Sequence, residues 1–148
     1  MIRQSEKITA LYCRLAHYDN ELMDHAIAQN QMNELSRYAE TNGLPNPQFF
    51  CDWGFSGTSH KRPEYQRMLR LMKQGQVSNL VVWDMSRLAR GFTACGKLLE
   101  TVLSRYGVTF HSVKDGLVYA PQEMRELAAT NKALYAFFRQ EQRRGGRR

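Results

Sequence analysis

Short apolar runs alternate along the chain with longer stretches in which apolar residues recur at helical spacing. The runs at 8–13, 48–51 and 108–113 are rich in residues that favour strands. The run at 80–83 is continuously apolar, which is typical of a strand buried on both faces. The pattern therefore predicts four strands, each followed by a helix.

The helices are predicted over 24–41, from Pro63 to about Gly75, over 92–105 and over 121–144, because apolar residues in these stretches recur at intervals of three and four. Asn42-Gly43 and Gly75 are typical helix ends, and proline is tolerated in a first helical turn. The expected inner faces comprise Ile27, Gln31, Leu35 and Tyr38; Tyr65, Met68, Leu69 and Met72; Cys95, Leu98, Leu99 and Val102; and Met124, Leu127, Ala128, Asn131, Leu134, Tyr135 and Phe138.

Strict alternation of strand and helix predicts the α/β class, with a mostly parallel central sheet flanked by helices and a long C-terminal helix. The length of 148 residues fits one domain. We expect a sheet domain over 1–120, the long helix over 121–144 and a basic tail over 145–148.

Composition narrows the class of protein. Apolar residues make up 43% of the chain and charged residues 24%, which excludes wholesale disorder. No apolar run is long enough for a membrane span, and residues 1–7 lack the apolar core of a secretory signal. The three cysteines show no CxxC spacing, so we expect reduced thiols, no metal site and a cytoplasmic protein.

Positive charge gathers at the end of the chain. The formal net charge is +7, and the last ten residues hold five Arg and one Glu. A basic end of this kind indicates a polyanionic partner, most simply nucleic acid, although a solvated helix end would have the same composition. The residues concerned are Arg139, Arg143, Arg144, Arg147 and Arg148.

Four further arginines follow the predicted strands. Sites in parallel α/β sheets lie at the carboxyl ends of the strands, so these arginines should converge on one edge. Guanidinium groups bind phosphate oxygens in a bidentate manner, although each could instead pair with an acid such as Asp19, Asp52 or Asp84. The four are Arg14, Arg62, Arg87 and Arg90.

Several motifs around these arginines resemble the serine site-specific recombinases: resolvases, invertases and large serine integrases. The segment at 11–16 resembles the Tyr-x-Arg-x-Ser opening of that family, and Gln31 matches its glutamine on the first helix. The segment at 84–90 is similar to its Asp-Met-Ser-Arg-Leu-Gly-Arg block. Further similar segments lie at 50–57, at 61–63 and at 114–116.

The resemblance implies a known chemistry. In the family a serine hydroxyl attacks a DNA phosphodiester and forms a 5′-phosphoserine link, and strands are exchanged within a tetramer without ATP, metal or other cofactor. The arginines stabilise the charge on the phosphoryl oxygens. By position this role would fall to Arg14, Arg62, Arg87 and Arg90, with Gln31 ordering the site. Asp84 is a weaker candidate, which could equally be an ordinary capping or ion-paired carboxylate.

The nucleophile position is occupied by Ala16, whose methyl group has no lone pair. The chain as written is therefore expected not to cleave DNA, and neither Ser86 nor Tyr18 is expected to replace the serine. Two explanations stay open: an engineered change, or natural decay. Departures from the family pattern at Lys61, Ala89, Gly91 and Phe137, and the lack of a downstream recognition domain, favour decay.

The resemblance also implies a role for the long helix, which forms the dimer in the family. We expect homodimerisation, a family-type tetramer in a synapse, and weak, sequence-tolerant DNA binding by the basic tail. The alternative is a non-catalytic module that dimerises with an active recombinase. A receiver-type domain is disfavoured, because its acidic pocket would lie where this chain has Arg14. The expected dimer residues are Leu127, Leu134, Tyr135 and Phe138.

Overall fold

The computed structural model describes residues 3–19, 21–55, 61–84, 87, 102–123 and 125–126. Its core is a five-stranded sheet in the order β2-β1-β3-β4-β5. All neighbouring strands are parallel except β5, which runs antiparallel to β4. The fold class predicted from the sequence is therefore confirmed. The strands are β1 (Ile8–Leu15), β2 (Pro47–Trp53), β3 (Val77–Val82), β4 (Thr109–Ser112) and β5 (Leu117–Tyr119).

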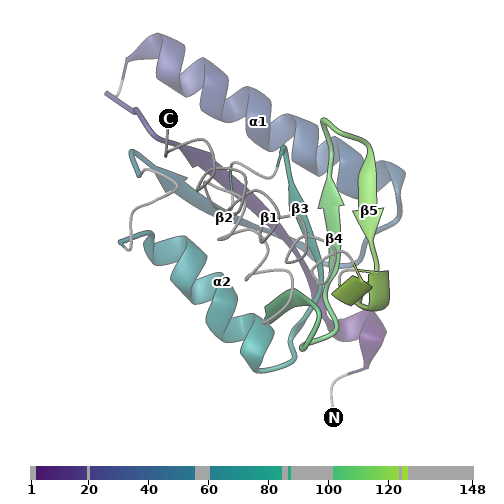
Figure 1. The fold of residues 1–148 in the computed structure, drawn as a ribbon. Coiled ribbons are helices and arrows are strands. Elements are labelled where there is room, and N and C mark those ends of the chain that lie inside the picture. Colours follow the sequence, from purple (N-terminus) through teal and green to yellow (C-terminus); the bar gives the residue numbers. More distant parts are fainter. Residues whose placement is uncertain are drawn as a thin grey trace, which may run out of the picture.

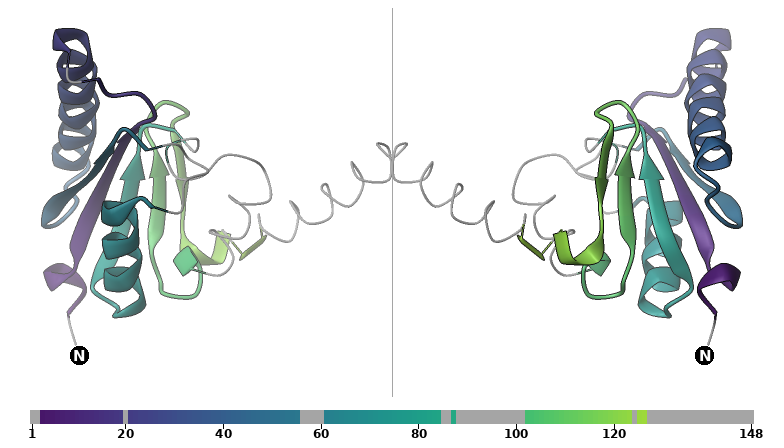
Figure 2. Two further views of the ribbon diagram at one scale, coloured as in Figure 1. Left: turned by 90° about the vertical axis from the view of Figure 1, so that its left-hand side faces the viewer. Right: turned by 90° about the vertical axis from the view of Figure 1, so that its right-hand side faces the viewer.

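Two long helices cover the sheet on opposite sides, α1 (Leu22–Thr41) and α2 (Pro63–Lys73) (Figure 1). The chain moves from β1 to β2 on one side and then back past β1 to β3 on the other. Right-handed crossovers in opposite directions place their helices on opposite faces. The side views in Figure 2 show the same layering. A short 3-10 helix (Gln4–Glu6) precedes β1.

The pleat of the central strand divides the core between the two helices. Ala10 and Tyr12 pack with residues of α2, whereas Leu11 and Cys13 pack with residues of α1. Both faces of β1 are thus buried, as the near-continuous apolar character of its sequence requires. The carboxyl end of β1 is held at the centre of one edge of this closed core.

The inner face of α1 differs slightly from the prediction. Its buried residues are Ala28, Gln31, Leu35 and Ala39, whereas Ile27 is 46% exposed. The small Ala28 lets the helix approach the sheet closely, so the buried stripe is rotated by one residue from the one that apolar character alone indicated. The prediction of Ile27 as a core residue was wrong.

Helix α2 and the four predicted strands follow the prediction with shifted ends. The buried residues of α2 are Tyr65, Met68 and Met72, as expected. β5 was not expected: its three residues are too short for a recognisable alternation, and they pair only after the turn at 113–116. The helix predicted over 92–105 lies outside the described residues except for its last turn, and so does the long helix beyond Glu126.

Two groups of interacting side chains lie on the α1 face. Cys13 and Cys51 are register partners on β1 and β2, and both are free thiols. His111 on β4 is buried between Tyr38 of α1 and Asn79 of β3. None of the helices in the described part of the chain has the length and apolar character needed to cross a lipid bilayer.

Candidate functional site

The carboxyl ends of β1 and β3 form the switch point of the sheet, because β2 lies on one side of β1 and β3 on the other. Ligands of open α/β sheets bind at such a point. Arg14 lies near the end of β1, and Arg87 follows β3 by five residues. These two predicted site residues contact each other here.

The contact between the two arginines runs through backbone oxygens. Arg14 Nε donates to the Arg87 carbonyl at 3.0 Å, and Arg87 Nη1 donates back to the Arg14 carbonyl at 3.2 Å. Arg14 Nη1 also donates to the carbonyl of Phe55, in the loop after β2, at 3.0 Å. The ends of three strands are therefore tied together by two guanidinium groups.

Gln31, on α1, also holds the backbone at the end of β1 in place. Its Oε1 accepts the backbone N–H of Arg14 at 3.0 Å, and its Nε2 donates to the Arg14 carbonyl at 3.4 Å. An amide that engages both backbone groups of one residue fixes that residue's position. Gln31 therefore fixes the backbone of Arg14, and its role in ordering a catalytic site stays a prediction.

Two of the arginines at this edge are almost fully buried. Arg14 is 3% exposed and Arg62 is 5% exposed. A cation removed from water needs polar partners, since an unpaired buried charge is strongly destabilising. Arg87 is half-buried, but its Nε is shielded from solvent and has no hydrogen-bond partner among the described residues. Within the part of the chain that the structure describes, this nitrogen is a donor that lacks an acceptor.

A small cavity lies beside Arg87 on the α1 side of the sheet. Its volume is about 140 Å³, and Arg87 and Gln31 contribute to its wall beside the indole of Trp83. The remaining lining residues come from α1: Ile27, Asn30 and Glu34. The cavity therefore borders one side of the arginine cluster.

Ala16, at the predicted nucleophile position, lies directly after β1 and is half-buried. The preceding carbonyl, that of Leu15, accepts the backbone N–H groups of Gly54 and Phe55 at 2.8 and 3.2 Å. The backbone around the nucleophile position is therefore well held, although its side chain offers only a methyl group.

Arg62 belongs to a second cluster, which the sequence analysis missed. Its Nη1 lies 3.4 Å from the hydroxyl oxygen of Tyr12, and its guanidinium carbon lies 3.8 Å from the ring centre of Tyr65. The Tyr12 hydroxyl in turn donates to Asp52 Oδ2 at 2.9 Å. Burial raises the pKa of Tyr12 well above its usual value, so the phenol stays protonated.

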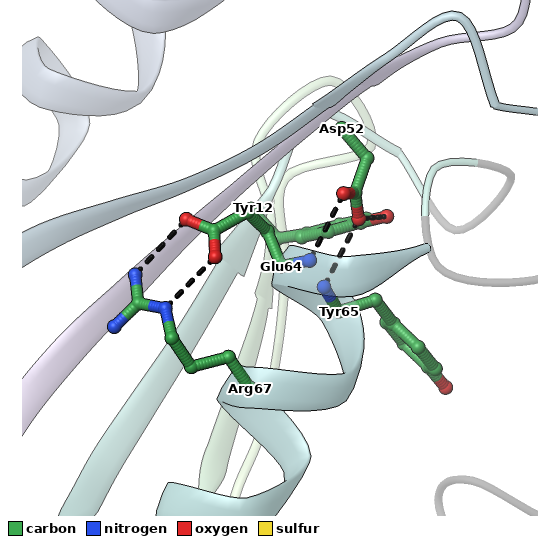
Figure 3. A network of polar contacts seen from close by, with 5 residues as sticks. All are labelled: Tyr12, Asp52, Glu64, Tyr65 and Arg67. Carbon is green, nitrogen blue, oxygen red and sulfur yellow. Dashed lines mark hydrogen bonds and ion pairs between the residues drawn. The ribbon is translucent and has the colours of Figure 1, made fainter. Parts of the chain in front are cut away.

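Asp52 also binds the start of α2 (Figure 3). Its two oxygens accept the backbone N–H groups of Glu64 and Tyr65, each at 3.0 Å. A β2 side chain thus caps the helix that follows Arg62, where unpaired N–H groups favour a negative charge. No sequence pattern marked these contacts, because they depend on the register of β1 and β2, in which Arg14 pairs with Asp52.

The remaining predicted residues are distributed as follows. Asp84 is half-buried after β3, and its carbonyl accepts the Arg87 backbone N–H at 3.2 Å. Arg90 and Ser86 lie outside the described residues. So do the predicted DNA-binding residues Arg139, Arg143, Arg144, Arg147 and Arg148 and the predicted dimer residues Leu127, Leu134, Tyr135 and Phe138. In the described part of the chain, no three His, Cys, Asp or Glu residues gather as a metal site would require.

Comparisons with known proteins agree with this arrangement. A family model described as "Resolvase, N terminal domain" matches residues 9–147. Among curated protein sequences, none matches the chain at a significant level.

Solved structures with the same fold include the N-terminal catalytic domain of TP901-1 integrase, with a TM-score of 0.72, 24% identity and coverage of 90% of this chain and 98% of that one. A resolvase family site-specific recombinase from Streptococcus pneumoniae has a TM-score of 0.72, 23% identity and coverage of 95% and 93%. A serine recombinase from Sulfolobus solfataricus has a TM-score of 0.55, 27% identity and coverage of 73% and 68%.

Proposed function

Because the chain belongs to the resolvase family of serine recombinases, we propose that its arginine site binds a phosphodiester of DNA without cleaving it. The family predicted from the motifs is confirmed, and the domain is of the resolvase catalytic type. Its proposed role is in site-specific recombination, as a DNA-binding domain that lacks the nucleophile of its relatives.

The proposal rests on Arg87 Nε, which is buried and has no hydrogen-bond partner among the described residues. A buried donor without an acceptor is rare in native proteins and indicates a missing partner. A phosphate oxygen is the partner that a guanidinium group binds best, and the cluster with Arg14 concentrates positive charge at this point. The proposed anion binding depends on the guanidinium group of Arg87 itself and does not require a carboxylate beside it.

Ala16 separates binding from chemistry. In-line attack on phosphorus needs an oxygen whose lone pair forms the new bond, and the alanine methyl has none. Arginines that stabilise charge on a phosphoryl group still favour binding when that attack cannot take place. We therefore expect the protein and DNA to form a reversible complex.

The binding part is tested by following the arginine Nε–Hε signals in ¹⁵N NMR spectra during titration with a short DNA duplex. We expect the Arg87 signal, assigned with Arg87→Lys, to shift with the bound fraction. Arg37, which is exposed on α1 and paired with Glu34, is the internal control. DNA binding that leaves the Arg87 signal in place would contradict the proposal.

The chemical part is tested with supercoiled plasmid and denaturing gels. The protein as given is expected to form no covalent adduct with DNA. Ala16→Ser is expected to give little or no turnover, because Lys61, Ala89, Gly91 and Phe137 also depart from the family pattern. An adduct formed by the unmodified chain would show that another residue serves as nucleophile.

The second candidate is an interaction module that joins an active recombinase and modulates it. The alanine at the nucleophile position favours this hypothesis, because a subunit that modulates an active recombinase would contribute contacts rather than cleavage. The proposed contact is the helix over 121–144 through Leu127, Leu134, Tyr135 and Phe138, after a sheet domain over 1–120. Co-purification with a full-length recombinase, lost in Leu134→Glu, would distinguish this role.

A further inference from the structure

Three aromatic rings meet at the strand-end edge, and one of them, Tyr18, lies two residues after Ala16. Tyr18 stacks on Trp53 with ring centres 6.0 Å apart and planes at 20°. His25, in the first turns of α1, meets Tyr18 edge to face at 5.4 Å. The three residues come from the loop after β1, the end of β2 and the start of α1. We call them the aromatic cluster.

A hydrogen bond fixes the orientation of the cluster. The Tyr18 hydroxyl lies 2.6 Å from His25 Nδ1. When the phenol donates this bond, the neutral imidazole carries its own proton on Nε2, at the other side of an exposed ring. The cluster thus combines flat apolar surface with a hydrogen-bond donor.

The cluster is connected to the arginine site by a short piece of backbone. Trp53 is the register partner of Leu15, whose carbonyl accepts the N–H of Phe55 at 3.2 Å. The carbonyl of Phe55 in turn accepts Arg14 Nη1 at 3.0 Å. The aromatic cluster and the buried guanidinium group of Arg14 are therefore joined through backbone contacts at the ends of β1 and β2.

The chemistry of the two parts fits one ligand. A nucleotide carries an anionic phosphate and a flat base, and base faces stack on aromatic side chains with little regard to sequence. Bases inside a duplex are already stacked on each other, so the matching ligand is a nucleotide in a single strand or a frayed end. Tyr18 and Trp53 are only half-buried, so ring surface is accessible.

We propose that the aromatic cluster of Tyr18, His25 and Trp53 is a stacking site for an unpaired DNA base next to a phosphate bound at the arginine site. This rests on the proposed function, because the phosphate brings the base to the rings. A cluster that only anchored the loop after β1 would contact no base.

The experiment compares two fluorescent probes by anisotropy at one low salt concentration: a 12-nucleotide thymidine strand, and an abasic strand with the same number of phosphates. The unmodified protein is expected to bind the thymidine strand about tenfold more tightly, as one or two stacked bases would require. Tyr18→Ala should abolish that preference, and Tyr18→Phe, which keeps the ring, should retain it.

Tyr106→Ala is the matched control, because Tyr106 is also half-buried but lies before β4, at the amino ends of the strands. It should leave the preference unchanged. Equal binding of both probes by the unmodified protein would overturn the stacking site while leaving phosphate binding intact. Equal weakening of both probes by Tyr18→Ala would also overturn it, in favour of loop anchoring. Failure of both probes to bind would remove the phosphate proposal as well.

Discussion

His111 makes the sheet sensitive to acid. The ring is 6% exposed, and both nitrogens are engaged: Tyr38 donates to Nδ1 at 2.8 Å, and Nε2 donates to Asn79 Oδ1 at 2.9 Å. Burial lowers the pKa of His111 from 6.5 to about 4, since a charged imidazole here would lose its hydration. The folded protein therefore holds this histidine neutral where the unfolded chain protonates it.

The free energy of unfolding is expected to fall as the pH drops from 6.5 to about 4, because only the unfolded chain takes up the proton over that range. Above pH 6.5 the contribution is fully present, and its loss amounts to about 3 kcal/mol. Urea titrations at several pH values measure it. His111→Gln should lower stability at neutral pH and flatten this dependence, and parallel curves for the two proteins would contradict the assignment.

The single side chain of Asp52 stabilises the start of a helix. Because it caps α2 and accepts the buried Tyr12 hydroxyl, Asp52→Ala removes a cap and strands a buried donor. We expect a loss of about 3 kcal/mol in urea unfolding. Glu64→Gln is the control: it weakens only the partly exposed contact to Arg67, which is worth less than about 1 kcal/mol. Similar losses in the two variants would refute the capping role.

Helices and strands were predicted from sequence where periodicity was strong. The apolar spacing of α2 and the continuous run in β3 identified both elements, and Pro63 and Gly75 bracketed the helix. Periodicity failed for β5, which is held by pairing after a turn rather than by a pattern of its own. It also misjudged Ile27, because a close helix-to-sheet approach favours the smaller Ala28.

Only part of the site could be predicted from the sequence, because many of its contacts involve backbone groups. Strand-end position identified Arg14 and Arg87, but their partners are backbone carbonyls, which every residue carries and no sequence pattern marks. Asp52 was considered as an ion-pair acid, whereas its observed contacts are a phenol and two backbone N–H groups. Such contacts depend on strand register, which follows only from the folded sheet.

The helix proposed over 121–144 gives a prediction about dimerisation. Leu134→Glu would place a charge in an apolar contact, at a cost of several kcal/mol. Sedimentation should shift from dimer to monomer while the circular dichroism of the sheet domain is retained. Lys132→Glu, two residues away, tests charge alone and should leave the dimer intact. An unmodified protein that is monomeric at tens of micromolar would remove the basis for this interface.

For the whole molecule, the net charge of +7 predicts salt-dependent DNA binding. If about four to six cationic groups contact phosphates, log affinity should fall against log salt with a slope of about −4 to −5. Truncation after Gln142 removes Arg143, Arg144, Arg147 and Arg148 and should reduce that slope by up to about 3 or 4. Replacing the four by lysine should preserve it, and an affinity that is flat between about 50 and 200 mM salt would contradict phosphate-driven binding.

The carbonyl contacts of Arg14 and Arg87 have a consequence for how genomes are searched. These guanidinium groups join strand ends whether or not a nucleophile is present, so their loss would loosen the sheet even in a chain that never cuts DNA. Purifying selection for folding alone can therefore preserve an arginine signature after catalysis has ended. The predicted nucleophile position, directly after β1, is therefore a more direct criterion for a DNA-cleaving chain than the arginines are.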